Sequence, residues 1–244
     1  MTKKYMLLYG KKSVLERLTA NPQSIKKIIT ADNFNDSKIS KLIEMHNIIN
    51  ESLSAKKVQD LKQAKNVQGI VAKVEHFVYA DFEQLLEQVN ELTLFFLDRI
   101  NDPQNLGVII RTLACFSGFA IVLPEKEATQ VTEAVMHVAS GGENYVKIAK
   151  VNDLQQAIIK AQKKGVNIAG AVIDVQAVDI RKADWVFPLG IVLGAETTGI
   201  STQIQKQLDQ KISIPMPGKK LSFNLAMAAT VFSYEITRQK KFSS

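Results

Sequence analysis

The chain is poor in the residues that build disulfides, metal centres and membrane spans. Its 244 residues include one cysteine, Cys115, and three histidines, His46, His76 and His137. A lone cysteine cannot form an internal disulfide, which favours a reducing compartment such as the cytoplasm. The histidines lack the spacing of metal ligands, so we expect no zinc or iron centre. We also expect neither a targeting leader nor a membrane span, because no charged-then-apolar leader and no sufficiently long apolar run is present.

Three common catalytic signatures are also missing. The stretch GAETTG at residues 194–199 does not follow the G-x-G-x-x-G pattern of dinucleotide-binding loops, and it lacks the lysine of a phosphate-binding P-loop. No G-x-S-x-G nucleophile elbow occurs. These absences disfavour a nucleotide-dependent oxidoreductase. Cys115 lies within the apolar stretch TLACFSGF, which predicts a core residue rather than a nucleophile.

The positive charge of the chain is concentrated in its first third. The whole chain carries a formal charge of +7, and residues 1–76 alone hold 14 Lys and Arg against 7 Asp and Glu. Residues 77–244 hold 17 of each kind, so they are neutral. A basic segment followed by a neutral one predicts that the first binds a polyanion such as RNA. A solvated lysine-rich surface would give the same composition, so this alternative stays open.

Short apolar runs alternate with amphipathic segments along the whole chain, which predicts an α/β fold. The basic bias ends near residue 76, so we predict a small basic α/β domain at residues 1–76 and a second domain at residues 80–244. In the second domain, nearly continuous apolar strands such as LTLFFLD alternate with helices, as is typical of a parallel sheet covered on both faces. The stretch after VNIAGAV is expected to be irregular, and SFNLAMAATVFSYEITRQKK is expected to form a long last helix.

Three expected strand ends are followed by loops suited to ligand binding. Strand LTLFFLD is followed by RINDPQN, LGIVL by GAETTG and ISIPM by PGKKLS. Each loop contains glycine, proline or a capping residue, which lets backbone amides and carbonyls face a ligand. Ligands of parallel sheets bind where loops leave the carboxyl ends of strands, so we predict the functional site there.

Five polar residues in or near these loops are the candidates for chemistry: Asn105, Arg111, Glu196, Ser222 and Asn224. Asn105 and Ser222 could serve only as N-caps of the helices that follow them, and Glu196 could be a solvated loop acid. Arg111 stands within an otherwise apolar helical run. We expect it on the inner face of that helix, where an arginine must be paired or functional.

Together the three loops resemble the three motifs of the SpoU, or TrmH-like, family of RNA 2′-O-ribose methyltransferases in the SPOUT superfamily. NLGVIIRT resembles N-x-G-x-x-x-R-T, GAETTGIS resembles G-x-E-x-x-G-[LI]-S, and IPMPGKKLSFNLAMAA resembles I-P-M-x-G-x-x-x-S-x-N-x-x-x-A-A. Their order and spacing match as well. YGKKSVLERL and NVQGIVAKV are similar to the opening and closing signatures of the family's small substrate-binding domain, itself similar to a ribosomal-protein RNA-binding fold. The resemblance therefore covers nearly the whole chain.

The resemblance implies that the second domain has a C-terminal trefoil knot whose loops bind S-adenosylmethionine, with no metal ion. Carried over by position, the residues that would enclose the cofactor are Leu193, Gly194, Gly199, Ile214, Met216, Ser222, Phe223, Asn224 and Leu225. It also implies RNA as the substrate, and the two-domain layout favours a guanosine ribose in large-subunit rRNA over tRNA. Relatives are homodimers, and the apolar last helix is a plausible interface element.

Methyl transfer to a ribose requires an oriented 2′-hydroxyl and support for the developing oxyanion. The resemblance implies that Arg111 contacts the target phosphate and the 2′-oxygen, that Asn105 and Glu196 fix its orientation, and that Ser222 and Asn224 shape the cofactor loop. The role of Arg111 as general base or as electrostatic stabiliser stays open. Guanidinium groups remain charged near neutral pH, which favours the second role.

Two positions depart from the family's pattern. The residue before the third-motif serine is often acidic and here is Leu221, and the position two after Asn224 is often serine and here is Ala226. All five candidate residues are retained, so we expect an active enzyme. The alternative from another class is a non-catalytic RNA-binding ribosome assembly factor, which would not bind S-adenosylmethionine.

Overall fold

The computed structural model describes residues 4–62, 67–174, 176–218 and 222–242. The chain divides into two compact units, of which unit 1 comprises Met1–Val78 and Val131–Tyr145 and unit 2 comprises Tyr79–Gln130 and Val146–Ser244. The segment Val131–Tyr145, which the sequence analysis assigned to the second domain, thus packs with the first unit. The chain crosses between the units three times.

Unit 1 is built on a four-stranded mixed sheet in the order β1-β4-β2-β3. Strand β4 runs antiparallel to both β1 and β2, whereas β3 runs parallel to β2. Its strands are β1 (Met6–Tyr9), β2 (Ile25–Ala31), β3 (Asn50–Leu53) and β4 (Ile70–Val74). Its helices are α1 (Lys11–Ala20), η1 (Pro22–Ser24), α2 (Ser37–Met45), α3 (Ala55–Asp60), α6 (Glu133–Ala139) and η2 (Gly142–Asn144).

Local signals explain where these helices begin. The Asp36 side chain accepts a hydrogen bond from the Ile39 N–H at 3.2 Å, which caps α2. The Thr132 hydroxyl caps α6 in the same way through the Val135 N–H. Gly10 precedes α1 with φ 90°, a backbone conformation that glycine adopts without a steric penalty.

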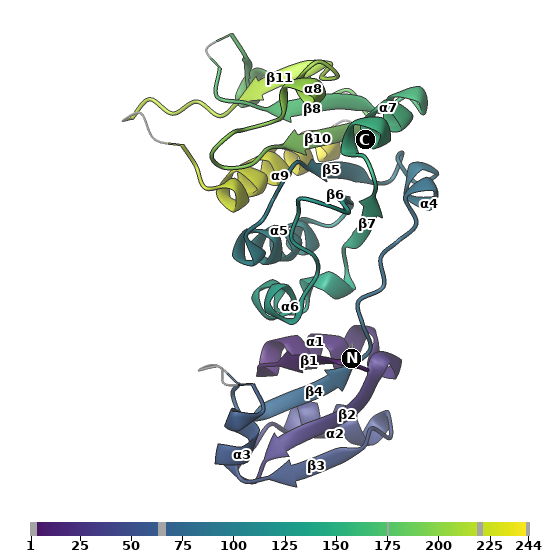
Figure 1. Ribbon diagram of the computed structural model, residues 1–244, viewed down its shortest axis with the longest axis vertical. Coiled ribbons are helices and arrows are strands. Elements are labelled where there is room, and N and C mark those ends of the chain that lie inside the picture. Colours follow the sequence, from purple (N-terminus) through teal and green to yellow (C-terminus); the bar gives the residue numbers. More distant parts are fainter. Residues whose placement is uncertain (1–3, 63–66, 175, 219–221, 243–244) are drawn as a thin grey trace. The chain divides into compact units, whose positions relative to one another are not determined.

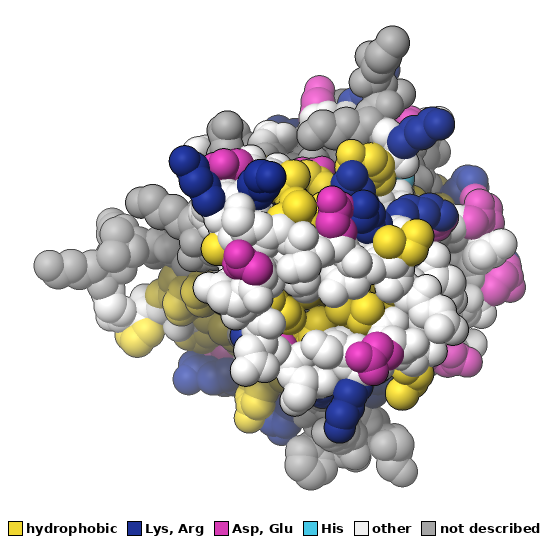
Figure 2. Space-filling view, turned by 90° about the horizontal axis from the view of Figure 1, so that it is seen from below, with side chains coloured by type: hydrophobic (Ala, Val, Ile, Leu, Met, Phe, Trp, Pro, Cys, Tyr) yellow, Lys and Arg dark blue, Asp and Glu magenta, His cyan; other side chains and the backbone are white. Residues whose placement is uncertain are grey.

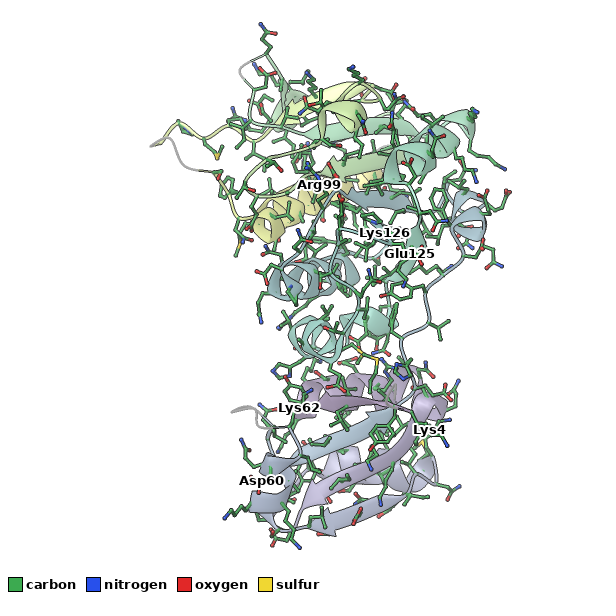
Figure 3. All side chains as sticks on the ribbon, viewed as in Figure 1. Lys4, Asp60, Lys62, Arg99, Glu125 and Lys126 are labelled. Carbon is green, nitrogen blue, oxygen red and sulfur yellow. The ribbon has the colours of Figure 1, made fainter. Side chains whose placement is uncertain are left out.

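The segment α6–η2 packs against α1 and β1 within unit 1. The His137 ring stacks on the Tyr9 ring with their centroids 4.0 Å apart. The Glu133 carboxylate accepts a hydrogen bond from the Leu7 N–H at 2.7 Å and forms an ion pair with Lys62, which Figure 3 labels. The segment therefore completes unit 1 although its sequence lies between two strands of unit 2.

A buried ion pair joins this segment to α1. Arg17 Nη2 donates to Glu143 Oε1 at 3.1 Å, and the two side chains are 6% and 0% exposed. Arg17 Nη1 also donates to the Ser24 hydroxyl at 3.2 Å. Burial raises the pKa of the Glu143 carboxyl although the Arg17 charge opposes this rise. The pair is thus desolvated, and each charge depends on the other for compensation.

Unit 2 contains a seven-stranded sheet in the order β7-β6-β5-β10-β8-β11-β9, in which all described pairings are parallel. Its strands are β5 (Thr93–Leu97), β6 (Phe119–Pro124), β7 (Lys147–Val151), β8 (Asn167–Ala171), β9 (Val178–Asp179), β10 (Leu189–Leu193) and β11 (Gln210–Ser213). Its helices are α4 (Phe82–Leu86), α5 (Pro103–Phe116), α7 (Leu154–Lys163), η3 (Ile180–Lys182), α8 (Thr202–Gln205) and α9 (Leu225–Phe242).

Helices cover both faces of this sheet (Figure 1). Apolar side chains of α4, α7 and α8 form one core with Leu94, Phe96, Val122, Ile168 and Val192 of the strands. Helices α5 and α9 pack side by side on the other face. The expected α/β class with a parallel sheet covered on both faces is confirmed, and the trefoil knot stays a prediction.

Several local expectations need correction. The N-cap of α5 is Asp102, whose side chain accepts from the Gln104 N–H, so Asn105 lies inside the helix and is not its cap. The last helix begins at Leu225 rather than at Ser222. Cys115 is exposed and not a core residue. The stretch expected to be irregular contains the short edge strand β9. None of the described helices is long and apolar enough to span a membrane.

We expect each single substitution in the buried ion pair to destabilise unit 1 strongly, and the double substitution to cost less than the sum of the two single losses. Arg17→Met or Glu143→Leu leaves the other charge buried without a partner, which should lower the free energy of unfolding by about 3–5 kcal/mol. The double variant removes both charges and should cost much less than the sum. Amide hydrogen exchange at Ile29 in the central strand β2 measures these changes.

The matched control is the ion pair between Lys26 and Glu75, whose side chains are 57% and 51% exposed. The same replacements there should cost less than about 1 kcal/mol. Additive losses for Arg17 and Glu143 would show that the two charges do not compensate each other.

Candidate active site

The three loops predicted from the sequence meet at the carboxyl edge of the parallel sheet. The loops after β10 and β11 line a cleft of about 400 Å³, to which the residues after β8 also contribute. The segment after β5 does not line the cleft but reaches its wall through the hydrogen bond from Asn105 to Glu196. The cleft lies at the carboxyl end of β10. The strand order reverses between β10 and its neighbour β5, because the chain runs from β5 to β6 and β7 on one side and returns to β8 on the other. Such a position is the usual ligand site of open parallel sheets. Its walls include the apolar residues Leu193, Ile200, Ile212, Ile214, Leu225 and Phe232.

The loop after β10 folds back tightly on itself. The Gly199 N–H donates to the Ala195 carbonyl at 2.8 Å, and these two residues form an isolated β-bridge. A Cβ atom on Gly194 would lie 2.1 Å from backbone atoms of Gly199 and Ile200, so only glycine allows this approach. The tip of the loop, Glu196 to Thr198, also lines the cleft.

A hydrogen-bonded trio joins the three motifs. Asn105 Nδ2 donates to Glu196 Oε1 at 2.6 Å. Asn224 Nδ2 donates to Glu196 Oε1 and to Asn105 Oδ1, both at 2.9 Å. Asn224 Oδ1 in turn accepts from the Ala226 N–H at the start of α9. Glu196 Oε1 thus accepts hydrogen bonds from two side-chain amides, one earlier in the sequence (Asn105) and one later (Asn224).

The predicted cofactor residues lie around the same cleft. Eight of the nine residues line it, namely Leu193, Gly194, Gly199, Ile214, Met216, Ser222, Phe223 and Leu225. The ninth, Asn224, does not line the cleft but bonds to Glu196, which does. Ser222 and Phe223 are exposed, and Leu221 lies outside the described residues. Ala226, which departs from the family's pattern, is buried, and its backbone N–H donates a hydrogen bond to Asn224 of the trio.

Arg111 lies elsewhere, and its expected burial is wrong. Its side chain is exposed on α5, it does not line the cleft, and it makes no hydrogen bond or ion pair with another described residue. The inner face of α5 is formed instead by Leu106, Ile109, Ile110 and Leu113. Because apolar residues also surround Arg111 in the sequence, the 3.6-residue period was obscured and the inner face was misassigned.

Two charged residues that follow β5 were not among the candidates from the sequence. Asp98 is 4% exposed; its N–H donates to the Leu193 carbonyl at 2.8 Å and its Oδ2 accepts from the Ser201 N–H at 2.7 Å. Arg99 Nη2 donates to the Gly199 carbonyl at 3.2 Å. Both residues therefore hold the loop after β10. The available signal was a charged pair directly after a fully apolar strand.

The cleft suits a small ligand with both apolar and polar parts. Its volume lies within the range of small-molecule sites, and its walls combine aliphatic side chains with loop backbone and the Glu196 carboxylate. Among the described residues, no group of three or more His, Cys, Asp and Glu side chains is arranged to hold a metal ion. The donor set fits an organic cofactor of nucleoside type.

Comparison with protein families identifies both parts of the chain. The profile of the SpoU rRNA Methylase family matches residues 92–234, which include all three loops. The profile described as RNA 2′-O ribose methyltransferase substrate binding matches residues 7–80.

Curated relatives match nearly end to end. The chain is 33% identical to the 23S rRNA (guanosine-2′-O-)-methyltransferase RlmB of Acinetobacter baylyi, over 95% of this chain and 96% of the relative. It is 28% identical to the putative TrmH family tRNA/rRNA methyltransferase YacO of Bacillus subtilis, over 98% of each chain.

Solved structures share the fold. The SpoU methyltransferase AviRb from Streptomyces viridochromogenes superimposes with a TM-score of 0.81 at 20% identity, covering 98% of this chain and 91% of that one. An AdoMet-bound rRNA methyltransferase from Sinorhizobium meliloti gives a TM-score of 0.80 at 22% identity, covering 97% and 88%. With the profile matches over both parts of the chain, these findings show that the protein belongs to the SpoU rRNA methylase family of S-adenosylmethionine-dependent RNA 2′-O-ribose methyltransferases.

Proposed function

We propose that this protein methylates the ribose 2′-hydroxyl of a guanosine in large-subunit rRNA. The observation that carries the proposal is the Asn105–Glu196–Asn224 trio, which brings the three family motifs together at the mouth of the loop cleft. The guanosine and the rRNA come from the relative named for that reaction, which matches 95% of this chain. Since the relatives named above are bacterial, we place the enzyme in the cytoplasm, where their ribosomes are made.

The loop cleft would hold S-adenosylmethionine. Leu193, Ile214 and Leu225 supply apolar walls for an adenosine, and the closed loop after β10 offers backbone groups for its polar edge. The absence of a side chain at Gly194 allows the loop to close without filling the cleft. Bound there, the cofactor would supply a methyl group attached to a positively charged sulfonium sulfur. The sulfur leaves as a neutral thioether when the methyl carbon is attacked in line, so no metal is needed.

Arg111 is the residue that we propose to act on the RNA. The reaction forms a bond from the 2′-oxygen to the methyl carbon and releases the hydroxyl proton, so negative charge develops on that oxygen. A guanidinium beside the target phosphate and the 2′-oxygen would stabilise this charge while the proton leaves to phosphate or water. Asn105, Glu196 and Asn224 would fix the shape of the cleft mouth, and Ser222 would line it.

The exposed position of Arg111 restricts how it meets the substrate. Since Arg111 does not line the cleft of its own chain, RNA must cross the outer face of α5, or the cleft must belong to a second copy. A homodimer is supported by the outer face of α9, where Met227 and Tyr234 are 56% and 58% exposed. The Tyr234 ring also packs edge to face with Phe116 of α5, which extends this apolar surface.

Unit 1 would bind the RNA around the target. Exposed lysines on α2 and α3 (Lys38, Lys41, Lys56 and Lys57) supply positive charge. Other lysines of this unit form ion pairs, as between Lys27 and Glu51, and in Figure 2 basic and acidic side chains alternate with uncharged ones. A mixed surface of this kind favours recognition of RNA shape over simple attraction to phosphate. A tRNA substrate remains the second candidate, because the Bacillus subtilis relative is named for both RNAs.

Gly194→Ala tests the cofactor cleft. The added methyl group would overlap the backbone of Gly199 and Ile200, so the loop must open. We expect the affinity for S-adenosylhomocysteine, measured by calorimetry, to fall by at least about tenfold, which corresponds to about 1.4 kcal/mol. Gly165→Ala is the control, since that glycine has open space around its Cβ position and does not line the cleft. Its φ of 83° adds backbone strain to the alanine variant, so the control also shows whether strain away from the cleft affects binding. Unchanged affinity in the Gly194 variant would place the ligand elsewhere.

Arg111 variants separate its charge from its geometry. We expect Arg111→Ala to reduce single-turnover methyl transfer by roughly 10²–10³-fold, as loss of an oxyanion donor does. Arg111→Lys should retain part of the rate because a cation remains. Neither variant should change S-adenosylhomocysteine affinity, since Arg111 does not line the cleft. Equal rate loss in both would indicate that the two-pronged guanidinium geometry is required.

Mapping of ribose methylation identifies the substrate. Total RNA from cells with and without the gene is compared at nucleotide resolution by resistance to alkaline cleavage. We expect one protected guanosine in large-subunit rRNA to disappear on deletion and to return with the wild-type gene but not with Arg111→Ala. A change confined to tRNA would support the second candidate, and no change in either RNA would favour a non-catalytic assembly factor.

A further inference from the structure

Arg99 adopts a backbone conformation that arginine rarely adopts. It directly follows Asp98 at the end of β5 and has φ 60°, in the left-handed region. A side chain with a Cβ atom is disfavoured there, and glycine, asparagine and aspartate are the residues that tolerate it best. Such a residue persists where surrounding contacts hold it, and it often marks a functional position.

Side-chain hydrogen bonds to Asp98 and to the loop after β10 hold Arg99 in place. Arg99 Nε donates to Asp98 Oδ1 at 3.2 Å, and Nη2 donates to the Gly199 carbonyl at 3.2 Å. The guanidinium is thereby fixed between the end of β5 and a backbone oxygen of the cleft loop. Figure 3 labels Arg99 in unit 2. The Arg99 side chain is 32% exposed, so these bonds form at the edge of the core.

Asp98 and Arg99 bind different parts of the loop after β10. Asp98 binds its two ends, through the Leu193 carbonyl and the Ser201 N–H, at 2.8 and 2.7 Å. Arg99 binds the returning arm at Gly199, which lines the cleft together with Ile200. Without Arg99, the Gly199 carbonyl would keep no described side-chain donor, whereas the ends of the loop would stay tied to Asp98.

We propose that Arg99 is a positioning residue that holds the returning arm of the cleft loop, and that its unfavourable backbone conformation is retained for this contact. This inference rests on the proposed function, in which the cleft holds S-adenosylmethionine. The guanidinium acts on the loop through Gly199 and does not line the cleft itself. A loop held in its binding shape loses less conformational freedom when the ligand binds, so the contact favours affinity.

The test uses Arg99→Gly in the full-length protein and measures ligand affinity at a temperature at which the variant is fully folded, so that binding is separated from stability. Glycine relieves the backbone strain but also removes the cation paired with the buried Asp98 carboxylate, so two opposing effects act on the melting temperature without ligand. Loss of the hydrogen bond to Gly199 should weaken S-adenosylhomocysteine binding by about tenfold in calorimetry. If Arg99 had only a structural role, the folded variant would bind S-adenosylhomocysteine as tightly as the wild-type protein.

Two further variants complete the test. Arg99→Asn tolerates the same φ but cannot reach Gly199 in the same way, so it should bind as weakly as Arg99→Gly. Arg99→Lys keeps one cationic donor and should recover part of the affinity. Binding within twofold of wild type in both Arg99→Gly and Arg99→Asn would overturn the proposal.

Amide hydrogen exchange keeps this test separate from the proposed function. In the protein without ligand, the Gly199 N–H should exchange at least about tenfold faster in Arg99→Gly, because the returning arm is released. The Ser201 N–H should change little, because Asp98 still holds it. If the wild-type protein bound no S-adenosylhomocysteine, the proposed function would fail, whereas unchanged exchange at Gly199 would refute the role of Arg99.

Discussion

The site depends on one carboxylate oxygen, Glu196 Oε1, which accepts hydrogen bonds from two asparagine side chains. Asn105 and Glu196 are 91 residues apart, and Asn224 lies 28 residues beyond Glu196. A carboxylate has only acceptors to offer, and a primary amide carries two donors, so each asparagine can bind the acid and still serve a second partner. Charged acceptors make hydrogen bonds roughly twice as strong as neutral ones. The trio thus ties together the first turn of α5, the loop after β10 and the residue that precedes α9.

The sequence was informative wherever a regular period or a dense motif existed. Alternating apolar runs predicted the parallel sheet, and the glycine-rich and proline-rich strand ends predicted the cleft, because parallel strands bring their carboxyl ends to one edge. The face on which Arg111 lies could not be derived, since apolar residues flank it on every side of the helix. Asp98 and Arg99 were missed because their partners, Leu193, Gly199 and Ser201, are about a hundred residues away, and no local pattern records such pairing.

Charged residues inside this chain have two different uses. In unit 1, Arg17 and Glu143 are almost fully buried and compensate each other, so their role is to join a distant segment to the sheet. In unit 2, Asp98 is equally buried, but its carboxylate accepts hydrogen bonds from the Ser201 N–H and from Arg99. Asp98 and Arg99 are thereby bound to the loop after β10. The first arrangement stabilises an architecture, and the second shapes a surface. Burial alone would not have distinguished them.

The assignment of Val131–Tyr145 to unit 1 bears on the order in which the molecule can be made. During synthesis the first 78 residues emerge with Arg17 but without Glu143, which is 126 residues further along the chain. Before that residue appears, unit 1 lacks the acid that neutralises its buried cation, while β5 and β6 of the other sheet are already synthesised. The two units are therefore not independent modules that could be exchanged at residue 78. A fusion that joins this substrate-binding unit to another methyltransferase would have to carry the helix α6 and the turn η2 with it.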